Sequence, residues 1–358
     1  IKYRDLLMER SLSANNRIGF AIVGLASHHR EFVAHAVHKI PGAFLVGAYD
    51  ADANRAKQFC QKFNTRCFAD LADLLQNPDV RIGAVSSENS RKKEYSIALA
   101  NAKKHVLCDN PLGITAQESR DIIEACKEAG VTLQVGYISR YTDQAQKAKR
   151  LVTSGKLGDV RFIDAENRVD SGLVKQLSPW LMRKDLAGGG SLMEQSVHAI
   201  DLALWLNDSP PVSAFAISAA NLDSTSYEGE DNFAIILRFK NRCIALIDGS
   251  YCRPSSGKRG DVVIKVHGSS KQLSFSLSSQ NIRAYFGEEP SLSMENYYSE
   301  AGGSSEEASG LRMIEDLLAS VRAGTEPLTN GIAGWNVNRV VDACYESLSS
   351  GREISIRS

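Results

Sequence analysis

Three side chains in one short segment have the types and the spacing that proton transfer requires. Glu194, His198 and Asp201 follow a triple glycine at successive spacings of four and three residues, so a helix would carry them on one face. A carboxylate one turn before an imidazole can orient the ring and stabilise its protonated form, and histidine titrates near neutral pH. The segment therefore predicts a general acid/base site in which Glu194 orients His198. An ordinary helix with a solvated polar stripe is the alternative interpretation.

A second group of residues follows an apolar strand near the N-terminus. Residues 18–24 form the expected strand, and Gly24, Ala26 and His29 occupy the places of the three glycines in the dinucleotide fingerprint G-x-G-x-x-G. Ala26 adds a methyl group where the backbone meets pyrophosphate, and His29 adds a side chain where helix and strand pack closely. The fingerprint is therefore degenerate, and an ordinary strand-to-helix turn is the alternative.

Two neighbouring features support a cofactor site. Asp50 ends the second expected strand, 26 residues after Gly24. An acidic side chain there hydrogen-bonds the 2′-hydroxyl of NAD and repels the 2′-phosphate of NADP, which predicts NAD in preference to NADP. His29 or Arg30, at the N-terminus of the following helix, is expected to contact phosphate. The cap of a turn is the alternative role of Asp50.

The elements that must position these residues form two patterns. Strands and helices alternate over residues 17–136, which predicts a doubly wound parallel sheet in a Rossmann dinucleotide-binding domain. Longer strands between residues 159 and 276 predict a large, mainly antiparallel, open-faced sheet in a second α+β domain over 137–358, for substrate binding and oligomerisation. A single helix is expected over 191–206.

The ends and the loops of the chain carry weaker signals. Residues 1–16 are expected to be a polar N-terminal extension, and a targeting segment removed before Ile1 is left open. The stretch 287–309 is rich in Ser, Glu and Gly, which predicts an exposed loop.

Composition excludes several classes of function. Lys and Arg together number 42, as do Asp and Glu, so no nucleic-acid partner is indicated. The longest apolar runs are far shorter than a bilayer span, which excludes a membrane-spanning helix. The seven cysteines are scattered and never spaced C-x-x-C, which favours reduced thiols in the cytoplasm and gives no metal site.

Several blocks of the chain together resemble the Gfo/Idh/MocA family of NAD(P)-dependent oxidoreductases. The resemblance covers residues 17–356, nearly the whole chain. It rests on the set of blocks, since none is specific alone. The matching blocks are Asn77-Pro-Asp-Val80, His105–Gly113, Val131–Tyr141, Ser154–Gly158, Gly188–Asp201 and Glu230–Phe239.

The chain departs from the family's pattern at functional positions. The family's E-K-P turn reads Asp109-Asn110-Pro111 here, and Asn110 can hydrogen-bond but cannot supply the positive charge of the lysine. Glu194 stands where the family has aspartate, and Ser196 where it has glycine. The histidine of the family's T-P-N-x-x-H turn is replaced by Lys92.

The resemblance assigns site residues position by position. His198, Glu194 and Asn110 would form the catalytic group. For Arg140, Trp180, Arg183 and Asp201 it implies substrate contacts, with surface or core packing as the alternative. Cofactor contacts are implied for Gly24, Ala26, Ser27, His29, Arg30, Asp50, Ser87, Asn89, Asp109 and Asn110.

The predicted function is an NAD-dependent dehydrogenase or reductase acting on a sugar, cyclitol or related polyol. His198 would take the hydroxyl proton while hydride passes from the same carbon to nicotinamide, and Asn110 would hold the hydroxyl or the carboxamide. The missing lysine leaves two alternatives: an NAD-using glycoside hydrolase, and a catalytically silent regulatory protein that binds cofactor or sugar. The resemblance also implies a homodimer or homotetramer through the open sheet face, where the strand 233–239 is apolar on both sides.

Overall fold

The computed structural model describes residues 17–222, 227–252, 261–277, 281–286, 293–298 and 306–357. The expected N-terminal extension, residues 1–16, lies outside the described residues. All the site residues expected from the sequence lie within them.

The first sheet is six-stranded and entirely parallel, in the order β3-β2-β1-β4-β5-β6. It confirms the doubly wound sheet that the alternating pattern predicts. Its strands are β1 (Ile18–Val23), β2 (Ala43–Tyr49), β3 (Arg66–Cys67), β4 (Val80–Val85), β5 (His105–Cys108) and β6 (Leu133–Val135).

Helices cover both faces of this sheet, which explains why its central strand is a continuous apolar run. Every residue of β1 is buried, as expected for a parallel strand between two helical layers. One side packs against α2 and α3, and the other against α4, α5 and α6. These helices are α2 (His29–Lys39), α3 (Ala53–Phe63), α4 (Leu71–Gln76), α5 (Asn89–Asn101) and α6 (Ala116–Ala129).

The second sheet has nine strands in the order β14-β13-β12-β11-β7-β10-β9-β8-β15. Only the β7–β10 ladder is parallel, so the expected mainly antiparallel character is confirmed. The strands are β7 (Val160–Arg168), β8 (Pro211–Ala219), β9 (Asn232–Phe239), β10 (Ile244–Ser250), β11 (Asp261–Gly268), β12 (Gln272–Ser276), β13 (Asn281–Phe286), β14 (Ser293–Tyr298) and β15 (Ile354–Ser355).

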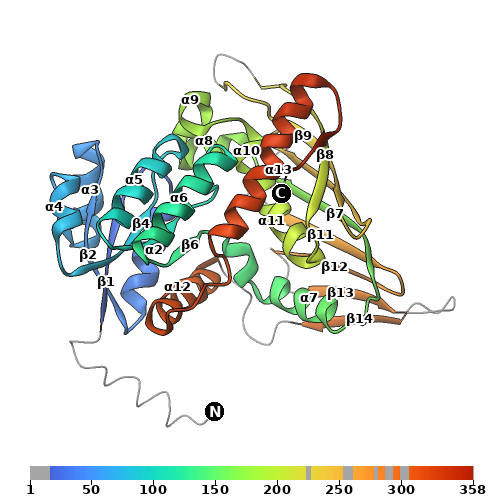
Figure 1. Ribbon diagram of the computed structural model, residues 1–358, viewed down its shortest axis with the longest axis horizontal. Coiled ribbons are helices and arrows are strands. Elements are labelled where there is room, and N and C mark those ends of the chain that lie inside the picture. The colour runs from blue at the N-terminus through green and yellow to red at the C-terminus, as the bar shows by residue number, and fades with distance from the viewer. Residues whose placement is uncertain are drawn as a thin grey trace, which may run out of the picture.

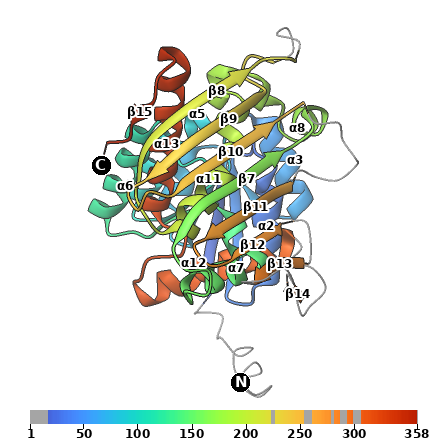
Figure 2. The same cartoon turned by 90° about the vertical axis from the view of Figure 1, so that its right-hand side faces the viewer.

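Helices of the second unit pack on one face of the large sheet, where α11 contacts β7 and β10 and α13 contacts β8. Figure 2 looks onto the other face, with the strands in front of the helices. Between the two sheets the chain forms η3 (Ile138–Tyr141) and α7 (Asp143–Thr153). The other helices are α8 (Ser171–Leu177), η4 (Pro179–Met182), α9 (Lys184–Ala187), α10 (Ser191–Glu194), α11 (Ser196–Asn207), α12 (Glu306–Ala323) and α13 (Gly331–Ser350).

One late helix returns to the first sheet. α12 follows the long strands in the chain, yet it lies beside α2 in space (Figure 1). Its residues Met313, Ile314 and Leu317 are buried in the same apolar cluster as Val33 and Phe20. The N-terminal unit therefore takes part of its core from the C-terminal third of the chain. The expected domain boundary after residue 136 stays a prediction.

The structure corrects the expected loop over residues 287–309. Strand β14 occupies Ser293–Tyr298 within that stretch, and α12 begins at Glu306. The rest of the stretch, 287–292 and 299–305, lies outside the described residues. No helix of the described chain is both long enough and apolar enough to span a membrane.

Candidate active site

The loop after β1 has a shape that depends on Gly24. Its φ angle is 74°, in the left-handed region that favours glycine. A Cβ atom at this position would lie 2.4 Å from Ser87 Cβ, closer than side-chain atoms approach. The next amide, of Leu25, donates a hydrogen bond of 2.5 Å to Asp50 Oδ2. The loop is therefore held by the segments that follow β2 and β4.

Asp50 follows β2 and forms a bidentate pair with Arg55, a residue that sequence reasoning missed. Arg55 Nε donates to Oδ2 at 3.0 Å and Nη2 donates to Oδ1 at 2.9 Å. The Asp50 side chain is 2% exposed and that of Arg55 33%. A ribose at this point would therefore meet a guanidinium as well as a carboxylate. The available signal was the position of Arg55, five residues after Asp50 and in the first turn of the following helix.

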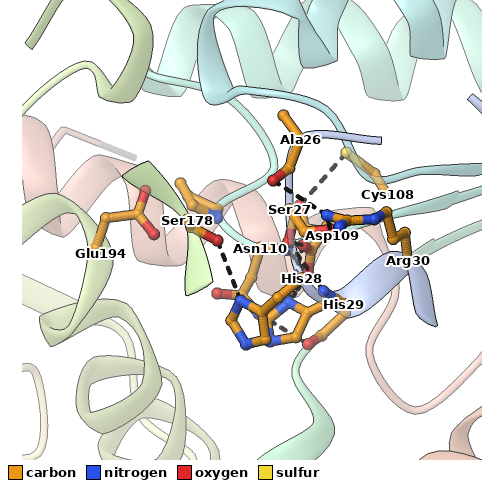
Figure 3. Close-up of polar contacts among 12 residues, drawn as sticks. Ala26, Ser27, His28, His29, Arg30, Cys108, Asp109, Asn110, Ser178 and Glu194 are labelled. Carbon is orange, nitrogen blue, oxygen red and sulfur yellow. Dashed lines mark hydrogen bonds and ion pairs between the residues drawn. The ribbon is translucent and has the colours of Figure 1, made fainter. Parts of the chain in front are cut away.

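Two contacts join the β1 loop to the turn after β5 (Figure 3). Ser27 Oγ donates to Asp109 Oδ2 at 2.8 Å, and His29 Nδ1 lies 2.9 Å from both carboxylate oxygens. Burial alone would raise the pKa of Asp109, but His29, Lys92 and Ser27 together hold it below its usual range. His29, which stands in the place of the third fingerprint glycine, thus contacts the turn after β5.

A segment from the second sheet's unit covers the same loop. Ala26 is 5% exposed, and its carbonyl accepts a hydrogen bond of 3.1 Å from Trp180 Nε1 on η4. Arg30 folds back and donates to the Ser27 carbonyl at 3.0 Å. His28 Nδ1 lies 3.2 Å from Ser178 Oγ, next to η4. Trp180, expected at the substrate, therefore contacts the expected cofactor loop.

Asn110 occupies the turn after β5. The residue is 5% exposed, and its Nδ2 donates a hydrogen bond of 2.9 Å to the Gly136 carbonyl, just after β6. Its own amide N–H donates to Asp109 Oδ1 at 3.0 Å. The side chain carries no charge and has one N–H group committed to the backbone. It can still accept a hydrogen bond.

Lys92 contributes the charge that this turn lacks, and sequence reasoning did not place it in the site. The lysine is 1% exposed, and its Nζ donates to the Asn110 carbonyl at 2.7 Å and to the Pro111 carbonyl at 3.1 Å. The available signal was its spacing of three residues from Asn89 and from Tyr95, which puts all three on the buried face of α5.

Asn89 links the two units at the same place. It is fully buried at the start of α5 and donates from Nδ2 to Glu194 Oε1, as well as to the Ala187 carbonyl at 2.8 Å. Asn89 Oδ1 is buried and has no hydrogen-bond partner among the described residues. The contact brings the Glu194 carboxylate to the edge of the first sheet.

The expected continuous helix over 191–206 is two helices. α10 ends at Glu194 and α11 begins at Ser196, with Gln195 between them. The carbonyl of Gln195 accepts a hydrogen bond of 2.9 Å from Asn167 Nδ2. Glu194 is bonded to Asn89, and within the described part of the chain the buried Nδ1 of His198 has no hydrogen-bond partner. The expected orientation of the ring by a direct carboxylate contact is therefore absent here.

Burial shifts the pKa values of Glu194 and His198 in opposite directions. It raises the pKa of Glu194 from 4.5 to about 7, against the nearby charge of Lys92. Burial, followed by the charge of His29, lowers the pKa of His198 from 6.5 to about 4. At neutral pH the imidazole is neutral and Glu194 is partly protonated. Desolvation thus outweighs the stabilisation of a charged histidine that the sequence led us to expect.

The triple glycine serves packing. A Cβ atom on Gly190 would lie 2.2 Å from the Glu230 carbonyl oxygen. The Glu230 carboxylate accepts hydrogen bonds from the amides of Gly190 at 3.0 Å and Leu192 at 2.9 Å, and from Tyr345 Oη at 3.0 Å. Glu230, which sequence reasoning did not single out, thereby fixes the start of α10 and the position of Glu194.

The remaining expected substrate residues form ion pairs within the protein. Arg140 donates to both oxygens of Asp201, at 2.9 and 2.7 Å, and the two side chains are 8% and 0% exposed. Arg183 pairs with Asp185 at the surface at 2.6 Å. Core packing therefore accounts for Arg140 and Asp201, and their contact with substrate stays a prediction.

The loop after β1 and its neighbours lie at the edge of the sheet where doubly wound folds bind dinucleotides. A cavity of about 20 Å³, room for no more than a water molecule, lies there at the carboxyl ends of β4, β5 and β6 beside α2. The N-terminus of α2 favours an anion such as a diphosphate. Across the described ranges, no cluster of His, Cys, Asp and Glu has a geometry for a metal ion. The pocket is lined by residues including His29, Ser86, Asp109, Gly136 and Ile138.

Comparison with known families matches both halves of the chain. Residues 18–137 match the NAD-binding Rossmann fold of an oxidoreductase family, and residues 149–356 match the C-terminal alpha/beta domain of the same family. A 1,5-anhydro-D-fructose reductase from Ensifer adhaerens is 28% identical over 261 residues, which are 72% of this chain and 75% of that protein.

Two further proteins extend the comparison. A myo-inositol 2-dehydrogenase from Thermotoga maritima is 26% identical over 220 residues, 61% of this chain and 64% of that protein. A levoglucosan dehydrogenase in complex with NADH and levoglucosan has a TM-score of 0.87 at 18% identity, covering 96% of this chain and 100% of that one. At this identity, the comparison shows that this chain and that enzyme share a fold.

Proposed function

Because the chain belongs to the Gfo/Idh/MocA oxidoreductase family, we propose that it is an NAD-dependent oxidoreductase of a sugar, cyclitol or related polyol. The names of the similar proteins support the substrate class, since they refer to an anhydrosugar, a cyclitol and levoglucosan. His198 is the proposed acid/base, and Glu194 and Asn110 are its partners in the site.

The residues proposed to hold the cofactor surround the β1 loop. Gly24 and Ser87 lie where two loops approach closely. The N-terminus of α2, next to the His29–Asp109 contact, offers the positive end of the helix dipole to the diphosphate. Asp50 and Arg55 face the ribose end. When bound, the nicotinamide supplies the redox partner for the carbinol carbon.

The observation that carries the proposal is the contact between Asn89 and Glu194. It brings a carboxylate from the second unit to the carboxyl edge of the parallel sheet, and His198 follows one turn later. A neutral imidazole accepts a proton from a hydroxyl, and a nearby Glu194 that can ionise then balances the charge. Asn110 holds the hydroxyl oxygen through the second N–H of its amide, since only one is bonded to the Gly136 carbonyl.

A second candidate is a protein that binds cofactor or sugar without turnover. It is favoured by the uncharged Asn110, whose amide is bonded to the Gly136 carbonyl, and by Trp180, which covers the Ala26 carbonyl. In that case the site would recognise the same ligands without proton transfer.

Calorimetry with NAD, NADH, NADP and NADPH, followed by a polyol screen at the reduced-nicotinamide absorbance, tests both candidates. We expect micromolar binding with NAD preferred, and turnover with a cyclitol or sugar. Binding without turnover across the screen would favour the silent protein. The absence of binding by all four nucleotides would contradict the oxidoreductase and leave a protein that binds sugar without turnover.

We also propose a homodimer or homotetramer formed through the open face of the large sheet. Apolar side chains on this face are exposed: Ile217 by 58%, Ile236 by 42% and Leu246 by 38%. They lie on adjacent strands β8, β9 and β10 (Figure 2). Exposed apolar side chains on neighbouring strands support association through this face.

A further inference from the structure

Lys92 is a buried charge that the proposed mechanism does not use. Its Nζ donates to two backbone carbonyls, those of Asn110 and Pro111, whereas an ammonium carries three N–H donors. A lysine is almost never fully buried unless its charge is balanced. The groups around Lys92 therefore indicate the role of its charge.

Acidic and basic groups of the site surround this ammonium on several elements. Lys92 and Asn89 lie one turn apart on one face of α5, and Asn89 is bonded to Glu194 of α10. Asp109 flanks the turn that Lys92 binds. Lys92 is close enough for its charge to lower the pKa of both carboxyls and of His198 on α11.

Other titratable groups face Glu194 and His198. His29 on α2 lowers the pKa of both, and Asp109 raises both. Tyr227 and Tyr251, before β9 and after β10, have pKa values that burial raises first and the charge of Glu194 raises further. Cys108 at the end of β5 has a pKa raised to about 11 by burial, so it is a neutral thiol at physiological pH. Lys92 thus contacts the turn of Asn110 and lies one helical turn from the residue that binds Glu194.

We propose that Lys92 is a positioning residue: it holds the turn of Asn110 through two backbone carbonyls and, one helical turn from the Asn89 that binds Glu194, acts on Glu194 and His198 through its charge without contact with substrate. The inference rests on the proposed function in one respect, that Glu194 and His198 are the acid/base pair. Its 1% exposure keeps the ammonium away from a ligand. Its influence is therefore electrostatic and conformational.

The test separates charge from hydrogen bonding by NMR titration of the whole protein without cofactor or substrate. His198 is assigned among the seven histidines with H198N, and Glu194 with E194Q. In Lys92→Gln, which keeps N–H donors but loses the charge, both midpoints should rise by on the order of 1 pH unit. Lys92→Met should give the same rise, and Lys92→Arg should keep the wild-type midpoints.

Lys93→Met is the matched control, because Lys93 lies next along α5 but pairs with Asp121 at the surface. It should leave both midpoints unchanged. Unchanged midpoints in K92Q would overturn the proposal. Since no turnover is measured, the proposed redox function can fail while this result holds, and the reverse is equally distinguishable.

Returning a cation to the turn adds a second test. Asn110→Lys should lower stability in the wild type, where two cations would crowd one site, but should return both midpoints toward wild type in K92Q. If neither neutral variant folds, N110K is added to each. Recovery of the fold supports a charge requirement, and failure to recover it overturns the proposal.

Discussion

At the residue scale, the site contains two titratable groups, Glu194 and His198. The environment of each moves its pKa toward the usual pKa of the other. Glu194 ionises near neutral pH, and His198 stays neutral well below it. Both shifts arise first from burial, which penalises the charged form of each group. Such pairs are typical of proton-transfer sites.

Replacing the proposed acid/base should remove turnover and leave cofactor binding in place. For His198→Ala we expect a loss of about 10²–10⁴ in kcat, the usual contribution of a positioned acid/base, with an unchanged Kd for NADH by calorimetry. His35→Ala is the control, because His35 is exposed on α2. A kcat within twofold of wild type would exclude His198 from proton transfer.

The opposite shifts make a prediction for stability. Between pH 7 and 4.5 the folded protein retains a Glu194 proton that the unfolded chain releases, so acidification through this window favours folding. Between pH 6.5 and 4 the unfolded chain binds a His198 proton that the folded protein does not, so acidification favours unfolding. In wild type the two effects largely offset each other.

Variants separate the two effects when the free energy of unfolding is measured in urea at about pH 7.5, 5.5 and 4.5, which together cover both titration windows. Relative to wild type, Glu194→Gln should lose stability on acidification and His198→Asn should gain it. Each change is at most about 3 kcal/mol, less the part screened by solvent. Parallel curves for the three proteins would show that the two pKa values are unshifted.

At the scale of elements, the position of the site depends on close contacts between loops. The β1 loop needs Gly24 for two reasons, its φ angle and its distance from Ser87. Gly130 provides a matched control, since its φ of 69° is similar but nothing lies within 4 Å of a Cβ atom there.

Gly130→Ala should therefore destabilise the protein by about 1 kcal/mol through backbone strain alone. Gly24→Ala should destabilise it further, by about 1–3 kcal/mol from overpacking, and should weaken NADH binding. Chemical denaturation and calorimetry measure both. Equal losses of stability in the two variants would mean that the loop yields without strain.

Some elements of the fold and the site can be predicted from the sequence and others cannot. The apolar run of β1 and the long alternating strands identify the two sheets, because burial imposes those patterns locally. The break at Gln195 leaves the helical period intact, so it is invisible in sequence. Lys92 has a charge that suggests exposure, whereas its spacing on α5 and its place in the family's T-P-N-x-x-H turn indicate the site. Arg140 and Asp201 are 61 residues apart, and their pairing arises from tertiary structure.

At the scale of the whole molecule, the large sheet presents one covered and one open face. The open face carries Ile217, Ile236 and Leu246 on adjacent strands. If copies of the chain associate there, one charge in the middle should separate them, because an unpaired buried charge is strongly unfavourable in an interface.

Ile236→Asp should reduce the mass measured by light scattering after size exclusion from an oligomer to a monomer. Ile332→Asp is the control: Ile332 is 50% exposed at the start of α13, which packs there against β6 of the other sheet. A wild-type monomer, or an oligomer unaffected by I236D, would contradict assembly through this face.

The return of α12 to the first sheet has a consequence for the order of events during synthesis. Strands β1 to β6 leave the ribosome first, but Met313, Ile314 and Leu317, which complete the core beside α2, follow much later. At about 5–20 residues per second, the interval from β6 to the end of α12 is roughly ten to forty seconds. During that time the nascent N-terminal unit exposes an apolar patch on α2. We expect chaperones that bind nascent chains to occupy this patch until α12 emerges.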